Sequence, residues 1–112
     1  MKVRYNLGEF EQVVLLAILG LQDEGAYGVS IRAKIAEHTF RDPTPGAIYT
    51  TLERLESKKL VKSSVGEATP ERGGRAKRYY EVTAQGFAEL KRARQAFESL
   101  ARGLKVLGEP NG

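Results

Sequence analysis

The chain has 112 residues, enough for one compact domain with a modest core but short enough that self-association can contribute much of its stability. It contains no cysteine, which excludes a disulfide framework and a thiolate metal site. The formal net charge of +4 is unevenly distributed: residues 41–80 contain nine Lys or Arg and five acids, whereas residues 1–40 contain four and five, so the middle of the chain favours a polyanionic partner.

Residues 9–22 are predicted to form a helix that is apolar on two faces. One apolar stripe consists of Phe10, Val13, Val14, Ala17 and Leu21, and the second consists of Leu15, Leu16, Ile18 and Leu19. Such a helix must be covered twice, by its own domain and by a second subunit or the C-terminal helix. Its apolar run is far shorter than the roughly 20 residues of a membrane span. Nothing near it resembles a sorting signal, so we expect a cytoplasmic protein.

A second helix is predicted from residue 27 or 28 to His38, after a left-handed turn that Gly25 can supply. Its apolar contacts are expected from Val29, Ile31, Ile35 and Ala36, and its outward face from Arg32, Lys34 and Glu37. His38 is the single histidine, and no second histidine or cysteine can complete a zinc site. We therefore expect no metal and no cofactor.

A third helix is predicted to begin near Pro45, because Thr44 can cap the free backbone amides and proline fits the first helical position. Its core stripe is Ile48, Leu52 and Leu55. Its free face is small and polar, and donors to base edges or phosphates are Tyr49, Thr50 and Arg54. This pattern is typical of a recognition helix over about residues 45–58, although a solvated helix that binds nothing would look similar.

The next segment predicts a β-hairpin with a long basic tip. Residues 60–65 and 77–83 favour strands, and the loop between them is rich in glycine. Four cations follow one another within seven residues and can track a phosphate backbone or reach a minor groove: Arg72, Arg75, Lys77 and Arg78. The alternative is a loop that only adds solubility, and the nearby acids Glu67 and Glu71 are consistent with it.

The last predicted element is a helix over residues 84–107, capped by Thr83 and about 36 Å long. Its apolar residues follow a heptad spacing: Phe87, Leu90, Ala93, Phe97, Leu100, Leu104 and Leu107. The seam can pack on the first helix of its own domain, but a helix of this length leaves apolar side chains uncovered in a monomer. Phe87 and Phe97 can line a small pocket, although core packing is their expected role. Gly103 should weaken the helix, and Gly108 with Pro110 should end it.

Several short segments resemble the PadR family of winged-helix transcriptional regulators. They are residues 46–56 (GAIYTTLERLE), Lys59-Leu60-Val61, residues 74–80 (GRAKRYY), Thr83 and Gly86. The segment from Tyr27 to Ile31 is also similar, although the family order Gly-Tyr is here Tyr-Gly. The resemblance covers about residues 10–107, and several motifs in order at the right spacing are specific.

The resemblance implies a mainly α fold with a small β-hairpin (α+β), a winged helix-turn-helix followed by a long C-terminal helix that makes a homodimer together with the first helix. It also implies a transcriptional regulator, commonly a repressor, that binds double-stranded DNA and in some cases responds to a small-molecule effector. We expect a DNA-binding domain at residues 1–83 and a dimerisation helix at residues 84–112. The operator and any effector are not readable from the sequence.

Two recognition helices related by a dyad should meet an inverted repeat whose half-sites lie about 10 base pairs apart. The residues predicted to bind DNA are Tyr49, Thr50, Arg54, Arg72, Arg75, Lys77 and Arg78. Those predicted to form the dimer are Phe87, Leu90, Phe97, Leu100, Leu104 and Leu107. A winged-helix module that binds protein is the alternative. An enzyme is not expected, because the chain offers no activated nucleophile and no paired acid and base.

Overall fold

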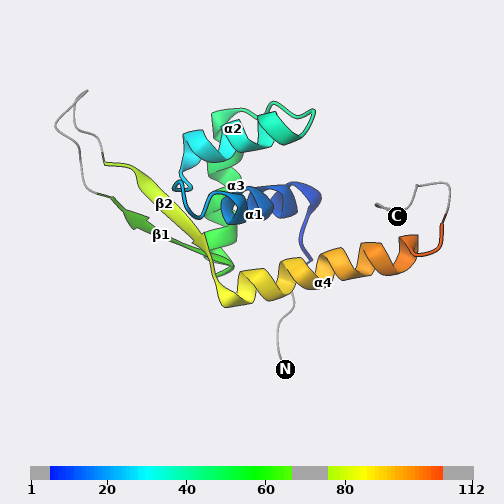
Figure 1. Ribbon diagram of the computed structural model, residues 1–112. Coiled ribbons are helices and arrows are strands. Elements are labelled where there is room, and N and C mark those ends of the chain that lie inside the picture. The colour runs from blue at the N-terminus through cyan, green and yellow to red at the C-terminus, as the bar shows by residue number, and fades with distance from the viewer. Residues whose placement is uncertain (1–5, 67–75, 105–112) are drawn as a thin grey trace.

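The computed structural model describes residues 6–66 and 76–104, which form helices and a two-stranded antiparallel hairpin (Figure 1). In chain order the elements are α1 (Glu9–Gly20), α2 (Gly28–His38), α3 (Pro45–Ser57), β1 (Val61–Val65), β2 (Arg78–Val82) and α4 (Ala84–Ala101). In the hairpin, Val61 pairs with Val82 and Val65 with Arg78. This order confirms the predicted α+β winged helix-turn-helix with a following helix.

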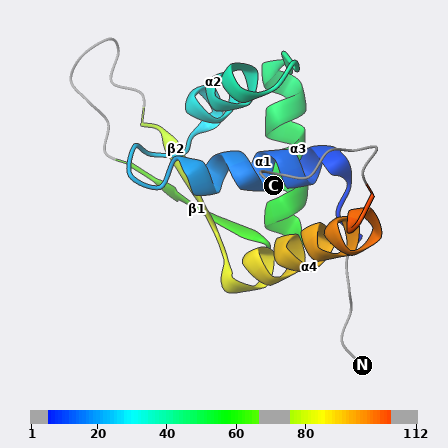
Figure 2. The ribbon, with the colours of Figure 1, turned by 45° about the vertical axis from the view of Figure 1, so that its right-hand side comes forward.

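The hydrophobic core lies where α1, α2 and α3 meet. The hairpin projects from one end of this group and α4 runs along its edge (Figures 1 and 2). The largest fully buried side chains come from all three helices and the start of β1: Val14, Leu15, Ile31, Ile35, Ile48, Leu52, Leu55, Leu60 and Val61. α1 packs on α2, α3, β2 and α4, so its two apolar faces are mostly covered within the chain. Leu16 is the exception in α1, with 42% of its surface exposed.

The prediction for α2 was wrong at two apolar positions. Val29 is 68% exposed and Ala36 is exposed, whereas Ile31 and Ile35 are buried. Residues advance by about 100° around a helix, so Val29 lies about 200° from Ile31, on the opposite face. α2 thus contributes two large side chains to the core, and its buried stripe is narrow.

α4 ends six residues earlier than predicted. The helix closes at Ala101, Arg102 has an extended backbone, and Gly103 adopts φ +83°. The helix is followed by a turn in which the Leu104 N–H donates to the Ala101 carbonyl oxygen at 3.0 Å, and Gly103 adopts the left-handed conformation of this turn without steric cost. The 18 helical residues span about 27 Å. Leu104 follows the helix, and Leu107 lies outside the described residues.

Only part of the apolar seam of α4 is covered by the rest of the chain. Leu90 is 3% exposed and belongs to the domain's own core. By contrast Phe87, Phe97 and Leu100 are 52%, 67% and 79% exposed, so core packing is not the role of either phenylalanine.

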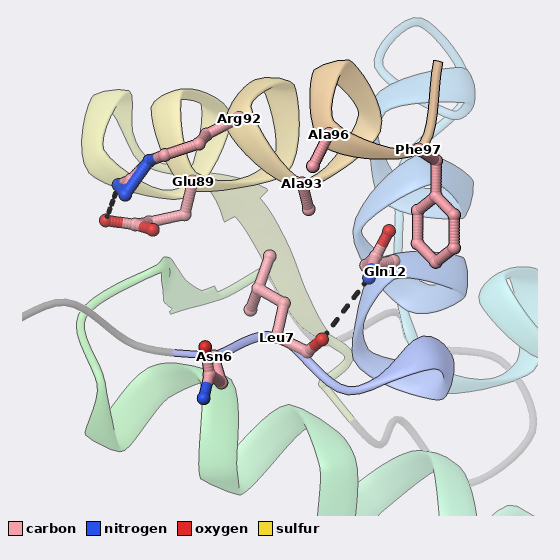
Figure 3. A pocket seen from close by; sticks show the side chains of 8 residues that line it. All are labelled: Asn6, Leu7, Gln12, Glu89, Arg92, Ala93, Ala96 and Phe97. Atoms are coloured by element: carbon pink, nitrogen blue, oxygen red, sulfur yellow. Dashed lines mark hydrogen bonds and ion pairs between the residues drawn. The ribbon is translucent and has the colours of Figure 1, made fainter. Parts of the chain in front are cut away.

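A hollow lies between the C-terminal part of α4 and the segment leading into α1. Figure 3 shows Ala93, Ala96 and Phe97 facing Leu7 and Gln12 across it. Glu89 and Arg92 pair at 2.6 Å on the same rim, and the Gln12 amide donates to the Leu7 carbonyl oxygen at 3.3 Å. The hollow therefore combines apolar walls with polar groups.

A buried ion pair joins the start of α1 to the end of α3. Glu11 is 5% exposed; its Oε1 accepts the Gly8 N–H at 2.8 Å, and its Oε2 accepts a bond from Lys58 Nζ at 2.8 Å. Burial by itself would raise the pKa of Glu11, but the hydrogen bonds from Lys58 and Gly8, with the charges of Lys58 and Arg54, hold this pKa below its ordinary value. The carboxylate is therefore stable as an anion and fixes α1 against α3.

We expect Lys58→Met to lower the free energy of unfolding by about 2 kcal/mol at pH 7, because it leaves a buried carboxylate without its cation. The pKa of Glu11 is depressed in the folded state, so the pair stabilises above the ordinary value of 4.5 and its contribution disappears as pH falls through the lower folded-state value. Urea denaturation at neutral and acidic pH should show the loss shrinking in acid.

Lys62→Met is the matched control. Lys62 pairs with Glu81 at 3.6 Å on the exposed surface of the hairpin, with both side chains about 70% exposed. Its removal should change stability by less than about 0.5 kcal/mol. Equal losses for the two variants would contradict the structural role of Glu11 and Lys58.

Candidate nucleic-acid interface

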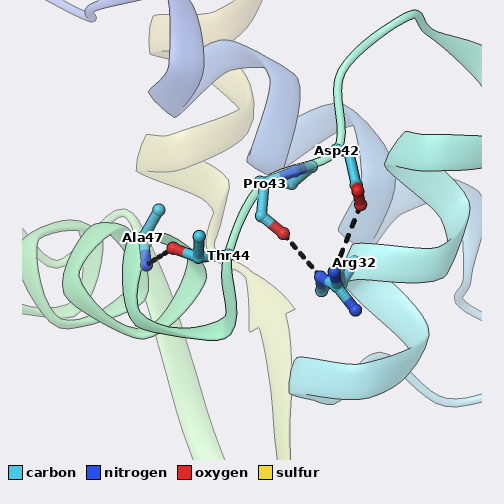
Figure 4. A network of polar contacts seen from close by, with 5 residues as sticks. All are labelled: Arg32, Asp42, Pro43, Thr44 and Ala47. Atoms are coloured by element: carbon cyan, nitrogen blue, oxygen red, sulfur yellow. Dashed lines mark hydrogen bonds and ion pairs between the residues drawn. The ribbon is translucent and has the colours of Figure 1, made fainter.

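The turn into α3 is held by side chains on both of its sides. Thr44 Oγ1 accepts the Ala47 N–H at 3.1 Å, which confirms the predicted cap (Figure 4). Arg32 of α2 donates to the Pro43 carbonyl oxygen and pairs with Asp42 at 3.1 Å. α3 therefore starts at a defined residue, in an orientation tied to α2.

α3 divides cleanly into a buried and an exposed face. Ile48, Thr51, Leu52 and Leu55 are buried. The exposed residues include the three that the sequence predicted as DNA contacts: Tyr49, Thr50 and Arg54, together with Glu53. At about 100° per residue, Glu53 lies between Tyr49 and Thr50 around the axis, and Arg54 lies beyond Thr50. The free face is thus polar, with one acid near its middle.

Tyr49 is less free than the sequence indicates. It is 50% exposed, and its ring lies against the backbone of Gly28, the first residue of α2. A Cβ at Gly28 would lie 2.4 Å from the Tyr49 hydroxyl oxygen, so only glycine leaves room for this ring. The sequence analysis assigned no role to Gly28. The feature that could have drawn attention to it is a glycine as the first residue of a predicted helix. The Tyr49 hydroxyl therefore lies beside the N-terminus of α2.

Arg54 lies toward a different part of the surface. Its positive charge is one of the causes that hold the pKa of Glu11 below its ordinary value. Arg54 lies in the last turn of α3, five residues after Tyr49 and about 140° around the axis from it, so the two residues occupy separate regions of the same helix.

The hairpin of β1 and β2, with the loop between them, is the wing, and Arg78 lies in its last residue pair before the loop, opposite Val65. Arg78 belongs to a chain of polar side chains across three elements. Its Nη1 donates to Ser63 Oγ on β1 at 3.0 Å, and Ser63 Oγ donates to Glu56 Oε2 on α3 at 2.7 Å. Arg78 is exposed but oriented by this chain. Lys77 is exposed as well, with its ammonium 4.3 Å from the centre of the Tyr27 ring. Arg72 and Arg75 lie outside the described residues.

The structure brings some of the predicted contacts together. Tyr27 is the residue before Gly28, so Lys77 from the wing and Tyr49 from α3 both meet the N-terminus of α2. Arg78, the first residue of β2, follows Lys77 in the chain, and its side chain is directed toward Ser63 of β1 and Glu56 of α3. We call the region where α3 and the hairpin meet the N-terminus of α2 the α2–α3–wing surface and define it by Tyr27, Tyr49, Thr50, Lys77 and Arg78.

Other kinds of site find no support in the described parts of the chain. Residues 6–66 and 76–104 contain no group of three or more His, Asp or Glu side chains that could hold a metal ion. None of the described helices has both the length and the apolar character needed to cross a bilayer.

Comparisons with known proteins agree with this fold. A model of the transcriptional regulator PadR-like family matches residues 15–92. The chain is similar to Transcriptional regulator Rv3488 of Mycobacterium tuberculosis (strain ATCC 25618 / H37Rv), with 37% identity over 86 residues, or 77% of this chain and 74% of the relative.

Solved structures show the same architecture. A PadR family transcription regulator from hypervirulent Clostridium difficile R20291 superposes with a TM-score of 0.67 and 23% identity, covering 88% of this chain and 97% of the other. F93 from STIV, a winged-helix DNA-binding protein, gives a TM-score of 0.63 and 14% identity over 88% and 98% of the two chains. At these identities the likeness shows the fold alone.

The fold is thus that of a winged-helix protein with a C-terminal helix. The chain belongs to the PadR-like family of transcriptional regulators, which confirms the resemblance of its motifs. It is a transcriptional regulator and not an enzyme.

Proposed function

We propose that the protein is a repressor that binds double-stranded DNA sequence-specifically, as a homodimer on an inverted-repeat operator. The observation that carries the proposal is the α2–α3–wing surface, where an exposed polar helix face adjoins two exposed cations of the wing. A helix with such a face fits the major groove, and adjacent cations suit the phosphates that flank it.

Within this surface the residues have different roles. Thr50 and Tyr49 contribute to the choice of sequence, together with Arg54, which lies elsewhere on α3, and Lys77 and Arg78 contact phosphate. Arg72 and Arg75, which the structure does not describe, belong to the same cationic run of the sequence. The Tyr49 hydroxyl lies beside the backbone of Gly28, at the N-terminus of α2.

The homodimer is inferred from apolar side chains of α4 that the rest of the chain leaves exposed. Phe87, Phe97 and Leu100 are more than half exposed, and Leu16 of α1 lines the groove beside Phe87. Burial of such side chains against a second copy removes apolar area from water, which is the main driving force of association. A twofold dimer presents two α3 helices to successive major grooves, about 34 Å apart.

The same region offers a place for an effector. The hollow of Figure 3 combines Leu7, Ala93 and Phe97 with the polar groups of Gln12 and Glu89, as a small amphipathic molecule requires. We therefore include an unidentified small-molecule effector in the proposal, and a cytoplasmic location where the DNA and the effector are both accessible.

The direct test is binding of the purified protein to the DNA just upstream of its own coding region. Footprinting should show protection with twofold symmetry, and repression should require that sequence in a reporter assay. Retention of no duplex at all at low ionic strength would contradict the proposal. It would favour the alternative of a winged-helix module that binds protein.

The wing supplies a second test. Replacing Arg75 and Lys77 by alanine should weaken binding by similar factors for all sequences, and should reduce the slope of log affinity against log salt by about four, because the homodimer loses two phosphate contacts in each subunit. Fluorescence anisotropy over a range of salt concentrations measures both effects. The matched control is Lys91→Ala with Arg102→Ala, which removes two charges from the region of α4 and should leave the slope unchanged. An unchanged slope in the wing variant would exclude the wing from the DNA contact.

A further inference from the structure

The hairpin packs against the segment before α2 through a group of residues that we call the aromatic joint and define as Tyr27, Tyr79, Gly25 and Gly66. The two tyrosine rings meet edge to face, with centres 5.6 Å apart and planes at 78°. A Cβ at Gly25 would lie 3.0 Å from Tyr79 Cε1, and one at Gly66 would lie 2.6 Å from Cε2. The Tyr79 ring thus occupies a slot between two glycines, with room for it only because neither has a side chain.

Backbone hydrogen bonds fix the same joint from both sides. The Tyr80 N–H donates to the Ala26 carbonyl oxygen at 2.8 Å, which ties β2 to the segment just before α2. The Gly66 N–H donates to the Lys77 carbonyl oxygen at 2.8 Å, which closes the described part of the hairpin. The backbone at Lys77 is therefore positioned by the segment before α2 as well as by the strand that pairs with β2.

Tyr27 also holds the side chain of Lys77. The Lys77 ammonium lies 4.3 Å from the centre of the Tyr27 ring, within the range of a cation–π contact. Lys77 is exposed and Tyr27 is half-buried, so the ring is the fixed partner and the lysine is the group that is oriented. A long lysine side chain otherwise samples many rotamers and must lose that freedom on binding.

We propose that Tyr27 is a positioning residue for DNA binding: its ring pre-orients the Lys77 ammonium toward a phosphate beside the N-terminus of α2. This inference rests on the proposed DNA-binding function. It assigns a role to Tyr27, which lies about 50 residues before Lys77 in the sequence and outside the cationic run. The ring itself makes no contact with DNA in this scheme; it acts through Lys77.

A double-mutant cycle on DNA binding tests the coupling. Tyr27→Leu should weaken binding about three- to fivefold, and Lys77→Ala about tenfold. The double variant should bind no more weakly than Lys77→Ala alone, because Tyr27 has nothing left to orient. Tyr27→Phe, which keeps the ring, should bind like the wild type.

The salt dependence separates the two roles. Lys77→Ala should reduce the salt slope of the homodimer by about two, one for each subunit, whereas Tyr27→Leu should leave it unchanged, because the lysine still neutralises its phosphate. The matched control is Lys62→Ala, on the other strand, where Lys62 pairs with Glu81. When Tyr27→Leu is combined with Lys62→Ala, the losses of DNA-binding free energy should be additive.

Additive losses for Tyr27→Leu and Lys77→Ala would overturn the inference, and so would binding by Tyr27→Leu equal to that of the wild type. One measurement needs no variant: the ε-methylene protons of Lys77 should be shifted upfield by the Tyr27 ring in the NMR spectrum of the free wild-type protein. Ordinary random-coil shifts there would overturn the inference even if Tyr27→Leu failed to fold. Failure of the wild type to bind any duplex is a different result, and would instead remove the proposed function.

Discussion

Replacing Gly86 by alanine should lower the free energy of unfolding by about 3 kcal/mol, one of the largest effects of any single methyl group in this chain. Gly86 is buried in the first turn of α4. A Cβ there would lie 2.1 Å from the carbonyl oxygen of Leu60 and 3.0 Å from its carbonyl carbon. Contacts this short cannot exist, so the backbone would have to move.

The Leu60 backbone has little freedom to move away. Its carbonyl oxygen accepts the Thr83 N–H at 3.0 Å, and the Thr83 hydroxyl donates to the Lys59 carbonyl oxygen at 2.9 Å. Thr83 also caps α4 by accepting the Gly86 N–H at 3.0 Å. A shift at Gly86 would thus disturb the cap and the segment that leads into β1 together.

Urea denaturation followed by circular dichroism measures this loss, and Gly46→Ala is the matched control. Gly46 is an exposed residue in the first turn of α3, where a Cβ would meet no atom closer than 4.0 Å. Because alanine favours the helix over glycine, this control should be neutral or stabilising by up to about 1 kcal/mol. A Gly86→Ala protein as stable as the control would show that the approach of α4 to Leu60 is looser than described.

The positions where helices begin were predictable because their causes are local. Thr44 and Thr83 both cap as predicted, and α3 and α4 start at the residues that follow. A cap requires only a side chain and an amide three residues away, so it is visible in a short stretch of sequence. The hairpin is similar: β1 and β2 lie within the two predicted strands.

Helix ends were less predictable, since a glycine near an end can either weaken the helix or stop it. α4 ends at Ala101, just before a turn that contains Gly103 in a left-handed conformation. The expected helix of about 36 Å was therefore too long. The heptad pattern also places Leu90, Phe97 and Leu100 in one seam, but only Leu90 packs into the core, and the other two side chains are exposed.

The candidate surface was predictable in its residue types but not in its side-chain directions. Tyr49 was expected to face outward, yet its ring is directed by Gly28, 21 residues earlier. Lys77 was expected to act as one cation of a run, yet it is oriented by Tyr27. Such contacts join residues far apart in the chain, and neither periodicity nor composition carries information about them.

The second large effect concerns the dimer. Phe97→Asp or Leu100→Asp should raise the dimer dissociation constant about 1,000-fold, because each twofold dimer loses the buried side chain and gains a desolvated charge at two equivalent places, at a cost of about 2 kcal/mol each. Sedimentation velocity at micromolar concentration should then show monomers. The domain itself should keep its stability, because both side chains are mostly exposed within one chain.

Ser99→Asp is the matched control, since it introduces the same charge on α4 about 200° around the helix from Phe97. It should remain dimeric. The monomeric variants should also lose affinity for an inverted repeat much more than affinity for a single half-site, because a dimer binds its second half-site at the high effective concentration that linkage provides. Intact dimers of both Phe97→Asp and Leu100→Asp would place the interface elsewhere. The uncovered end of α4 would then be free for the effector or another protein.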